Sequence, residues 1–385
     1  MLDPRPRKER PPLDLWFERT FGDDAPSHLG TGWVSGTAGV FLGGLALLGV
    51  LAFHFPAWLS TERFRGLYPL PILRTVLQSV IALAFLSGIL SLLLRRRKVL
   101  GLTGCTLALG ATLLGGSGLS VEGPLDRPVT LGLDWFLLNL FLLALLFVPL
   151  ERLFPRWPRQ GPFRIGWTTD GLHFLGSHVF VQALSFLILL PATTLAGLWR
   201  PDGLQALVRG QPVWMQALEC VLVADVAQYA VHRLFHEVGW LWRFHAVHHS
   251  SQALDWLAAS RLHLVDVLVT RSLVLVPLFL LGFAEGALQA YLVFVSFHAV
   301  FIHANVRFRF GRFLESLIVT PRFHHWHHAA SPEARDKNFA VHLPWLDRLF
   351  GSAWMPGQDR WPEEYGAPGD AVPPGYVGQL AYPFR

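Results

Sequence analysis

The sequence predicts an all-α integral membrane protein, a multi-span helical bundle with a cytoplasmic histidine-rich metal-binding cap. Three observations lead to this fold class. The 385 residues are 52% apolar and only 15% charged, whereas soluble chains carry about 25% charged residues. Apolar runs long enough to cross a bilayer recur along the chain. Histidines gather in ordered groups that begin where one of these runs ends.

Eight apolar runs are predicted as helices. Six have the length of a membrane span, and the last two are predicted as a hairpin that need not fully cross. In chain order they are Val34–Phe53, Thr75–Leu94, Val99–Leu119, Leu131–Leu150, Phe174–Leu198, Val213–Val231, Val267–Gly282 and Leu288–Ile302.

Composition divides the chain into four regions. Residues 1–31 are polar and proline-rich and are predicted as a loose tail, without the cleavage pattern of a signal peptide. Residues 32–150 form a predicted four-helix transmembrane block. A segment rich in Pro, Arg and Trp then leads into a predicted catalytic domain at 151–355, and residues 356–385 are predicted as an irregular tail.

Basic residues beside the apolar runs predict the orientation. Four consecutive basic residues at 95–98 and the arginines of 152–164 fall on the same side of the membrane. The positive-inside rule places that side in the cytoplasm, so the sixth run leaves the membrane there at Val231. Arginine outnumbers lysine, which favours a bacterial source and hence the inner membrane. The net charge of +5 is explained by these flanks, and no nucleic-acid-binding motif is present.

Twelve of the 17 histidines lie between residues 232 and 328. They include His232–His236 (HxxxH), His245–His249 (HxxHH) and His324–His328, which contains a second HxxHH. Helical residues three and four apart share a face, so HxxxH can hold one metal ion. The last two histidines of HxxHH diverge by about 100°, so that motif can serve two ions. Imidazole suits Fe, Zn, Cu and Ni, so the ligand type alone does not choose the metal.

Other residues of this region have different predicted roles. Asp225, Tyr229, His232 and His236 lie on one face of one predicted helix. A carboxylate inside an apolar run is costly unless it is functional, so we expect Asp225 to orient a ligand histidine. His325 lies off the shared face of its HxxHH and is predicted as a neighbour of the site. The isolated histidines are predicted to be structural or exposed: His28, His54, His173, His178 and His342.

Competing chemistries fit less well. His236-Glu237 is not followed by xxH, so the zincin motif is absent, and no G-x-S-x-G elbow is present. Cys105 and Cys220 both lie in apolar runs, which excludes a disulfide framework or a cysteine zinc site. A metal-binding or metal-transport protein without oxygenase activity stays open as the alternative. It would need ionisable residues along several spans, and the first four runs carry almost none.

At these motifs the sequence resembles the fatty acid hydroxylase superfamily, also called the sterol desaturase family, over about 150–356. The histidine motifs resemble the family's HxxxH, HxxHH and Pro-x-x-HxxHH. Further resemblances are Arg261-Leu-His263, His303-Ala-Asn305-Val306 and the closing Asn338 with Trp345-Leu-Asp347-Arg348-Leu-Phe350-Gly351. The departure is Phe339-Ala340 in place of Tyr-Gly. It is expected to touch no ligand and to affect the substrate side more than the metal site.

The resemblance implies a di-iron centre that uses O2 to hydroxylate or desaturate a sterol, fatty acyl or other membrane lipid. Zinc is expected to replace iron in some preparations. Electrons must come from an external ferredoxin-, cytochrome b5- or reductase-like donor. His298 and His303 are further candidate ligands, separated by about 140° on an ideal helix, and Asp225, Tyr229, His263 and Asn305 are expected to support catalysis. The expected metal ligands are His232, His236, His245, His248, His249, His324, His327 and His328.

Overall fold

A computed structural model describes residues 12–21, 30–60, 69–120, 132–161, 163–357, 360–367, 369 and 371–385. Over these residues the protein is helical and has no strand, only two isolated β-bridges. Five helices are long and apolar enough to cross a membrane. A bent pair of helices adds a sixth such segment if it is counted as one span. The predicted fold class, an all-α membrane protein with a histidine cluster, is therefore confirmed.

The described residues form two compact units, residues 12–142 and residues 143–385. The first unit holds α1 (Pro12–Phe21), α2 (Trp33–His54), α3 (Pro56–Leu59), α5 (Leu70–Leu94), α6 (Val99–Leu113), η2 (Gly116–Gly118) and the start of α7 (Leu133–Leu153). The predicted loose tail at 1–31 lies partly outside the described residues, and its described part includes the helix α1. The predicted span Leu131–Leu150 also starts outside them.

Small residues hold the helices of the first unit close together. A Cβ on Gly39 of α2 would lie 3.0 Å from the backbone nitrogen of Gly88 in α5, and a Cβ on Gly43 would lie 3.0 Å from the Gly104 oxygen of α6. Membrane helices pack through such small residues because lipid offers no hydrophobic drive for their association. The first unit is therefore a close-packed apolar bundle.

The second unit begins with the end of α7 and holds two groups of helices. The bundle helices are α8 (Trp167–Ala183), α9 (Ser185–Leu198), α10 (Asp202–Arg209), α11 (Val213–Glu237), α13 (Leu264–Leu281) and α14 (Glu285–Phe301). The shorter elements are α12 (Gly239–His249), η3 (Ala258–Ser260), α15 (Gly311–Leu317), α16 (Pro321–His327), η4 (Pro332–Ala334), α17 (Trp345–Leu349), α18 (Tyr376–Ala381) and η5 (Tyr382–Phe384).

Two predicted spans of this unit differ in the structure, and a third agrees. The run Phe174–Leu198 is two helices, α8 and α9, bent by 52°, and α8 starts earlier, at Trp167. Helix α11 has 25 residues but is not among the helices apolar enough to cross the membrane, because Gln216, Glu219 and Asp225 interrupt its apolar run. Helix α14 has 17 apolar residues, in keeping with a hairpin arm that need not fully cross.

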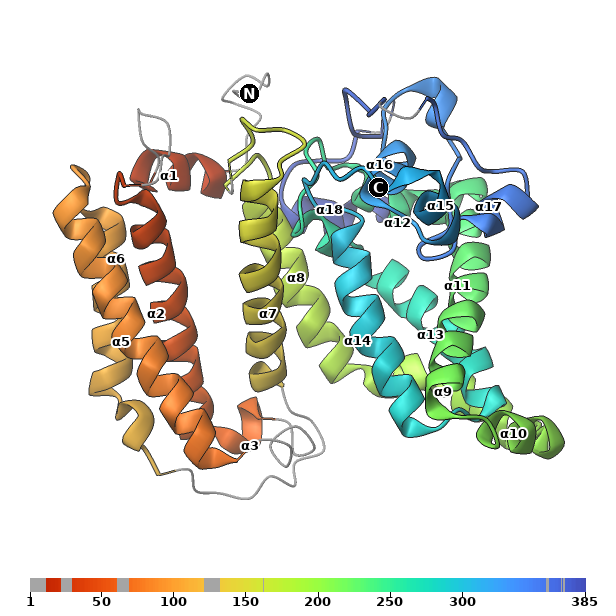
Figure 1. Ribbon diagram of the computed structural model, residues 1–385, viewed down its shortest axis with the longest axis horizontal. Helices are drawn as coiled ribbons and strands as arrows, with labels where there is room; N and C mark the ends of the chain where they lie inside the picture. The colour runs from red at the N-terminus through yellow and green to blue at the C-terminus, as the bar shows by residue number, and fades with distance from the viewer. Residues whose placement is uncertain are drawn as a thin grey trace. The chain divides into compact units, whose positions relative to one another are not determined.

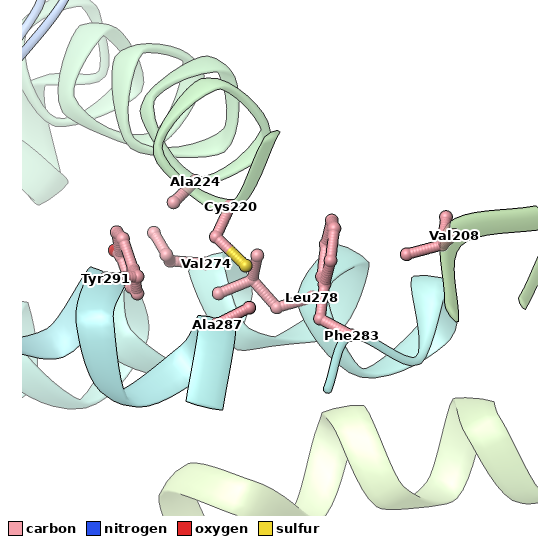
Figure 2. Close-up of a cluster of buried hydrophobic side chains, with 8 residues drawn as sticks. All are labelled: Val208, Cys220, Ala224, Val274, Leu278, Phe283, Ala287 and Tyr291. Atoms are coloured by element: carbon pink, nitrogen blue, oxygen red, sulfur yellow. The ribbon is translucent and has the colours of Figure 1, made fainter. Parts of the chain in front are cut away.

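An apolar core joins the bundle helices away from the histidine motifs. Cys220 and Ala224 of α11 face Leu278 of α13 and Ala287 of α14 (Figure 2). Cys220 is buried and free. The packing aligns α11 and α14 so that their last turns, which carry histidines, end on the same side of this unit as α12, α16 and α18 (Figure 1).

The end of the chain is more ordered than its composition indicates. Residues 356–385 were predicted as an irregular tail, but α18 and η5 occupy Tyr376–Phe384. The Gln379 side-chain oxygen accepts a hydrogen bond from Nε2 of His173 in α8 over 2.8 Å, and the Gln379 side-chain nitrogen donates to Ser250 after α12. Phe384 packs against Phe244 of α12. The chain terminus therefore supports the helix that carries HxxHH.

Candidate metal centre

Nine buried or nearly buried histidines converge in two groups of metal-binding geometry. In each group, one ring nitrogen from every residue lies within 4.8 Å of the corresponding nitrogens of the others. The five-histidine group is His232, His236, His245, His249 and His327. The four-histidine group is His248, His303, His324 and His328.

Each histidine motif contributes to these groups as its helical spacing requires. The HxxxH at the end of α11 places both residues in the five-histidine group. The HxxHH of α12 sends His249 to the five-histidine group and His248 to the four-histidine group. The HxxHH of α16 divides in the same way, with His327 in one group and His328 in the other. Adjacent histidines diverge by about 100° on a helix, so one motif serves both groups.

Most of these rings are oriented by a hydrogen bond from their outer nitrogen, Nδ1. The acceptor is a backbone oxygen for His232 (Phe339, 2.7 Å), His248 (Arg261, 3.0 Å), His303 (Ala299, 2.7 Å) and His327 (Lys337, 2.8 Å). It is a carboxylate for His245 (Asp266, 2.7 Å) and His236 (Asp336, 3.2 Å). These oxygens only accept, so Nδ1 carries the ring proton and Nε2 presents a lone pair.

Pairs of Nε2 atoms in both groups face each other without a proton between them. His232 and His245 approach Nε2 to Nε2 at 3.0 Å, and His248 and His303 at 3.2 Å. In each pair both Nδ1 atoms are already donors, so two lone pairs face each other. The Nε2 atoms of His236, His249 and His327 are buried without any hydrogen-bond partner. A cation between the lone pairs removes this conflict, so both groups fit bound metal ions.

Burial lowers the pKa of eight of these histidines and so favours their neutral form. It lowers the pKa of His232 to about 3 and that of His303 to about 4. Burial, followed by repulsion from neighbouring histidines, holds the pKa of six others well below the usual 6.5: His236, His248, His249, His324, His327 and His328. Neutral imidazole is the form that binds metal.

The remaining candidate histidines lie outside both groups. His298 contacts His342 (Nδ1 to Nδ1, 2.9 Å) and the Val319 oxygen. His263 caps the start of α13 by accepting from the Val265 N–H, and its Nε2 lies 3.1 Å from the Leu380 oxygen. His325 contacts the Tyr365 hydroxyl at 2.8 Å and backbone oxygens, as expected for a neighbour of the site.

Asp225 and Tyr229 bond to the segment that follows Phe339. Asp225 is fully buried and accepts the backbone N–H groups of Val341, His342 and Leu343, not a ligand histidine. The Tyr229 hydroxyl bonds to Ser352 at 2.7 Å. Both therefore hold the segment that follows Phe339, whose oxygen orients His232.

Asn305 ties the chain together next to His303. Its Oδ1 accepts the Trp157 N–H at 2.8 Å, and its own N–H donates to Glu151, which also accepts the Trp256 N–H. Asn305 thus fixes the turn 302–305 against the 155–157 segment. No direct contact between Asn305 and either histidine group is found.

Phe339 touches the centre, contrary to expectation. Its oxygen accepts from His232, and its ring packs edge-on against His236 at 5.0 Å between centroids. The N–H groups of Phe339 and Ala340 both donate to Asp347. The departure from Tyr-Gly at 339–340 is therefore at the five-histidine group itself, and not remote from it.

Sequence reasoning missed two carboxylates, Asp266 and Asp336. Asp266 lies in the first turn of α13, inside an otherwise apolar run. The cost of a carboxylate in such a run, which singled out Asp225, applies equally to Asp266. Asp336 has φ of 55° and an exposed side chain, and nothing in its local sequence marks it.

A buried ion network supports the four-histidine group from α8. Arg261, whose oxygen orients His248, donates through Nε to Asp170 at 2.5 Å. Arg164 pairs with Asp170 (2.5 Å) and with Asp255 (2.6 Å). Two arginines and two aspartates offset each other, which is what allows four buried ionisable groups at one place.

Comparison with known proteins places these motifs in a family context. A family model described as fatty acid hydroxylase matches residues 217–352. Ornithine lipid hydroxylase of Rhizobium tropici is 34% identical over 44% of this chain and 52% of its own length. Alkylglycerol monooxygenase of Homo sapiens is 31% identical over 34% of this chain and 29% of its own length. Cholesterol 25-hydroxylase-like protein 2 of Danio rerio is 33% identical over 34% of this chain and 47% of its own length.

The matches cover about half or less of each of these relatives. No solved structure matches the chain.

Proposed function

Because the chain belongs to the fatty acid hydroxylase superfamily through residues 217–352, we propose that it is an O2-dependent di-iron enzyme. It oxidises a C–H bond of a sterol, fatty acyl or other membrane lipid by hydroxylation or desaturation. The observation that carries this proposal is the pair of histidine groups with inward lone pairs. The names of two relatives, an ornithine lipid hydroxylase and an alkylglycerol monooxygenase, also support an oxygen-inserting enzyme.

The nine histidines of the two groups are the proposed metal ligands. Two bound iron ions would supply the activation of O2 that an unactivated C–H bond requires. The chain's own residues orient the ligand rings through Nδ1, keep them neutral by burial, and exclude water. Phe339 contributes to this exclusion, since its buried ring covers His236. Zinc also accepts imidazole ligands, so we expect zinc in some preparations.

Asp225, Tyr229, His263 and Asn305 are proposed as positioning residues. Asp225, Tyr229 and Asn305 each connect a segment that carries a proposed histidine ligand to the rest of the unit, as the hydrogen bonds of Asp225 to 341–343 illustrate. His263 caps the start of α13, whose Asp266 orients His245. We also propose an external ferredoxin-, cytochrome b5- or reductase-like electron donor. The proposed location is the bacterial inner membrane, with the metal centre facing the cytoplasm, where the positive-inside rule places the basic flanks.

The test combines metal content with lipid analysis. Cells with the gene, without it, and with His248→Ala are compared for ornithine lipids, alkylglycerols, sterols and acyl lipids. About two metal ions per chain and one lipid class heavier by an oxygen atom support a hydroxylase, whereas loss of two hydrogens supports a desaturase. Metal flux or metal tolerance with no oxidised lipid would favour the metal-handling alternative. A folded protein without stoichiometric metal would contradict the proposal.

A further inference from the structure

The two histidine groups differ in what their outer nitrogens contact. In the five-histidine group, His245 and His236 donate to the carboxylates of Asp266 and Asp336. In the four-histidine group, His248 and His303 donate to backbone oxygens. A carboxylate carries a full negative charge, whereas a peptide oxygen carries only part of a dipole. The two groups are therefore electrostatically unequal.

Asp266 is the stronger of the two carboxylate partners. It is 4% exposed, and its Oδ2 lies 2.7 Å from Nδ1 of His245. Its other oxygen accepts the Thr270 hydroxyl at 3.0 Å, which fixes the orientation of the carboxylate. The distance from Asp336 to Nδ1 of His236 is longer, at 3.2 Å, and the Asp336 side chain is 53% exposed. Water screens an exposed charge far more than a buried one.

No comparable net charge supports the four-histidine group among the described residues. Asp170 acts on His303 electrostatically, but Asp170 pairs with both Arg164 and Arg261. The second aspartate of that network, Asp255, also pairs with Arg164. The charges of this network cancel, so it places no net charge beside the rings of the four-histidine group.

This difference affects metal affinity. A divalent ion among neutral imidazoles is a buried charge with no counter-ion, which is costly. A carboxylate on Nδ1 offsets that charge and raises the basicity of Nε2. Its loss typically lowers metal affinity about 10- to 100-fold. The five-histidine group has both this support and one more nitrogen than its neighbour.

We infer that the two metal sites fill unequally: the five-histidine site binds the first and tighter ion, and Asp266 is the positioning residue that sets this order. The inference rests on the metal centre of the proposed function, but not on its lipid substrate or its use of O2.

The experiment uses the full chain in detergent, stripped of metal and titrated with Zn²⁺ against a competing chelator. The unsubstituted protein is expected to bind two ions in two steps. Asp266→Asn keeps an acceptor oxygen but removes the charge, and should weaken the tighter step about 10-fold or more while changing the weaker step less than about 3-fold. Asp266→Ala removes the acceptor as well and should weaken the tighter step about 100-fold.

Two further variants assign the steps and control for charge. His303→Ala removes a ligand of the four-histidine group and should abolish only the weaker step. Asp336→Asn is the graded comparison, because it removes the exposed carboxylate that bonds to His236 of the same group, and it should weaken the tighter step less than Asp266→Asn does. Thr270→Val, which removes only the hydroxyl donor to Asp266, provides a milder variant if Asp266→Ala does not fold.

Several results would overturn the inference: two equal steps in the unsubstituted protein, an Asp266→Asn effect shared equally by both steps, or an effect on the weaker step alone. Lipid analysis of the same cells separates this inference from the proposed function. Two unequal Zn²⁺ steps that depend on Asp266, without any oxidised lipid, would support the inference and contradict the oxygenase. Oxidised lipid together with equal Zn²⁺ steps would support the oxygenase and contradict the inference.

Discussion

The Nδ1–H of His232 donates to the backbone oxygen of Phe339 over 2.7 Å, across 107 positions of the chain. The ring of Phe339 also covers His236, and the backbone N–H of Phe339 donates to Asp347. One residue thus orients a proposed ligand through its backbone and shields another through its side chain. These two functions can be separated by substitution.

Phe339→Leu should retain both metal ions, because the backbone oxygen remains and an apolar side chain still fills the space. Phe339→Ala should lower the free energy of unfolding by about 3 kcal/mol, since Phe339 is 2% exposed and its loss leaves a cavity. Thermal unfolding and metal analysis of the two purified variants test this. Equal stability of both variants would contradict the packing role of the ring.

His248→Ala should abolish lipid oxidation and lower metal content while membrane insertion is unchanged. His248 belongs to the four-histidine group, and its loss removes one of four proposed ligands. His325→Ala is the matched control in the same buried region. His325 bonds to Tyr365 and to backbone oxygens, so its loss should cost about 1–3 kcal/mol of stability but leave two metal ions bound. Retained activity in His248→Ala would contradict the ligand assignment.

Asp225→Ala should destabilise the protein and weaken metal retention, although Asp225 touches no histidine ring of either group. It leaves three N–H donors without their acceptor, that of His342 buried and those of Val341 and Leu343 partly buried, at about 1–3 kcal/mol for the buried one. The freed segment 341–343 adjoins Phe339, which orients His232. Glu237→Gln is the control, because its exposed pair with Arg233 contributes about 1 kcal/mol or less. Thermal unfolding and metal content of both variants are the readouts.

The local part of the site could be predicted from the sequence because helical spacing decides it. HxxxH and HxxHH place their rings by about 100° per residue, and the structure has both α12 and α16 dividing their histidines as that angle requires. Helical spacing could not show which of His298 and His303 joins a histidine group. Helix α14 ends at Phe301 and a turn follows, and this turn brings His303 to the four-histidine group.

Contacts between distant segments could not be predicted. Asp266 orients His245 from 21 positions away, and Asp225 binds a segment 116–118 positions away. Neither pairing leaves a periodic pattern, because both depend on how α11, α12 and α13 pack. The 52° bend between α8 and α9 was missed for a similar reason, since hydropathy is continuous across it.

Shortening the chain by Tyr376–Arg385 should lower stability and metal retention. This segment contacts His173 and Ser250 through Gln379, His263 through the Leu380 oxygen, and Phe244 through Phe384. Gln379→Ala should show a weaker form of the same effect, about 1 kcal/mol per hydrogen bond lost. Val377→Ala is the control, because Val377 is 77% exposed. Full metal retention without the segment would contradict its supporting role.

Acidification should destabilise the metal-free protein. Burial lowers the pKa of His325 to about 3 and that of His303 to about 4, whereas unfolded histidine titrates near 6.5. Below about pH 6.5 the unfolded chain therefore binds more protons than the folded chain. The free energy of unfolding falls as the pH falls toward the folded pKa values. Above about pH 7.5 these histidines are neutral in both states and have no effect on stability. His325→Ala should reduce the slope by about 1.4 kcal/mol per pH unit. Thermal unfolding between about pH 5 and pH 8 measures this, and greater stability at the acidic end would contradict it.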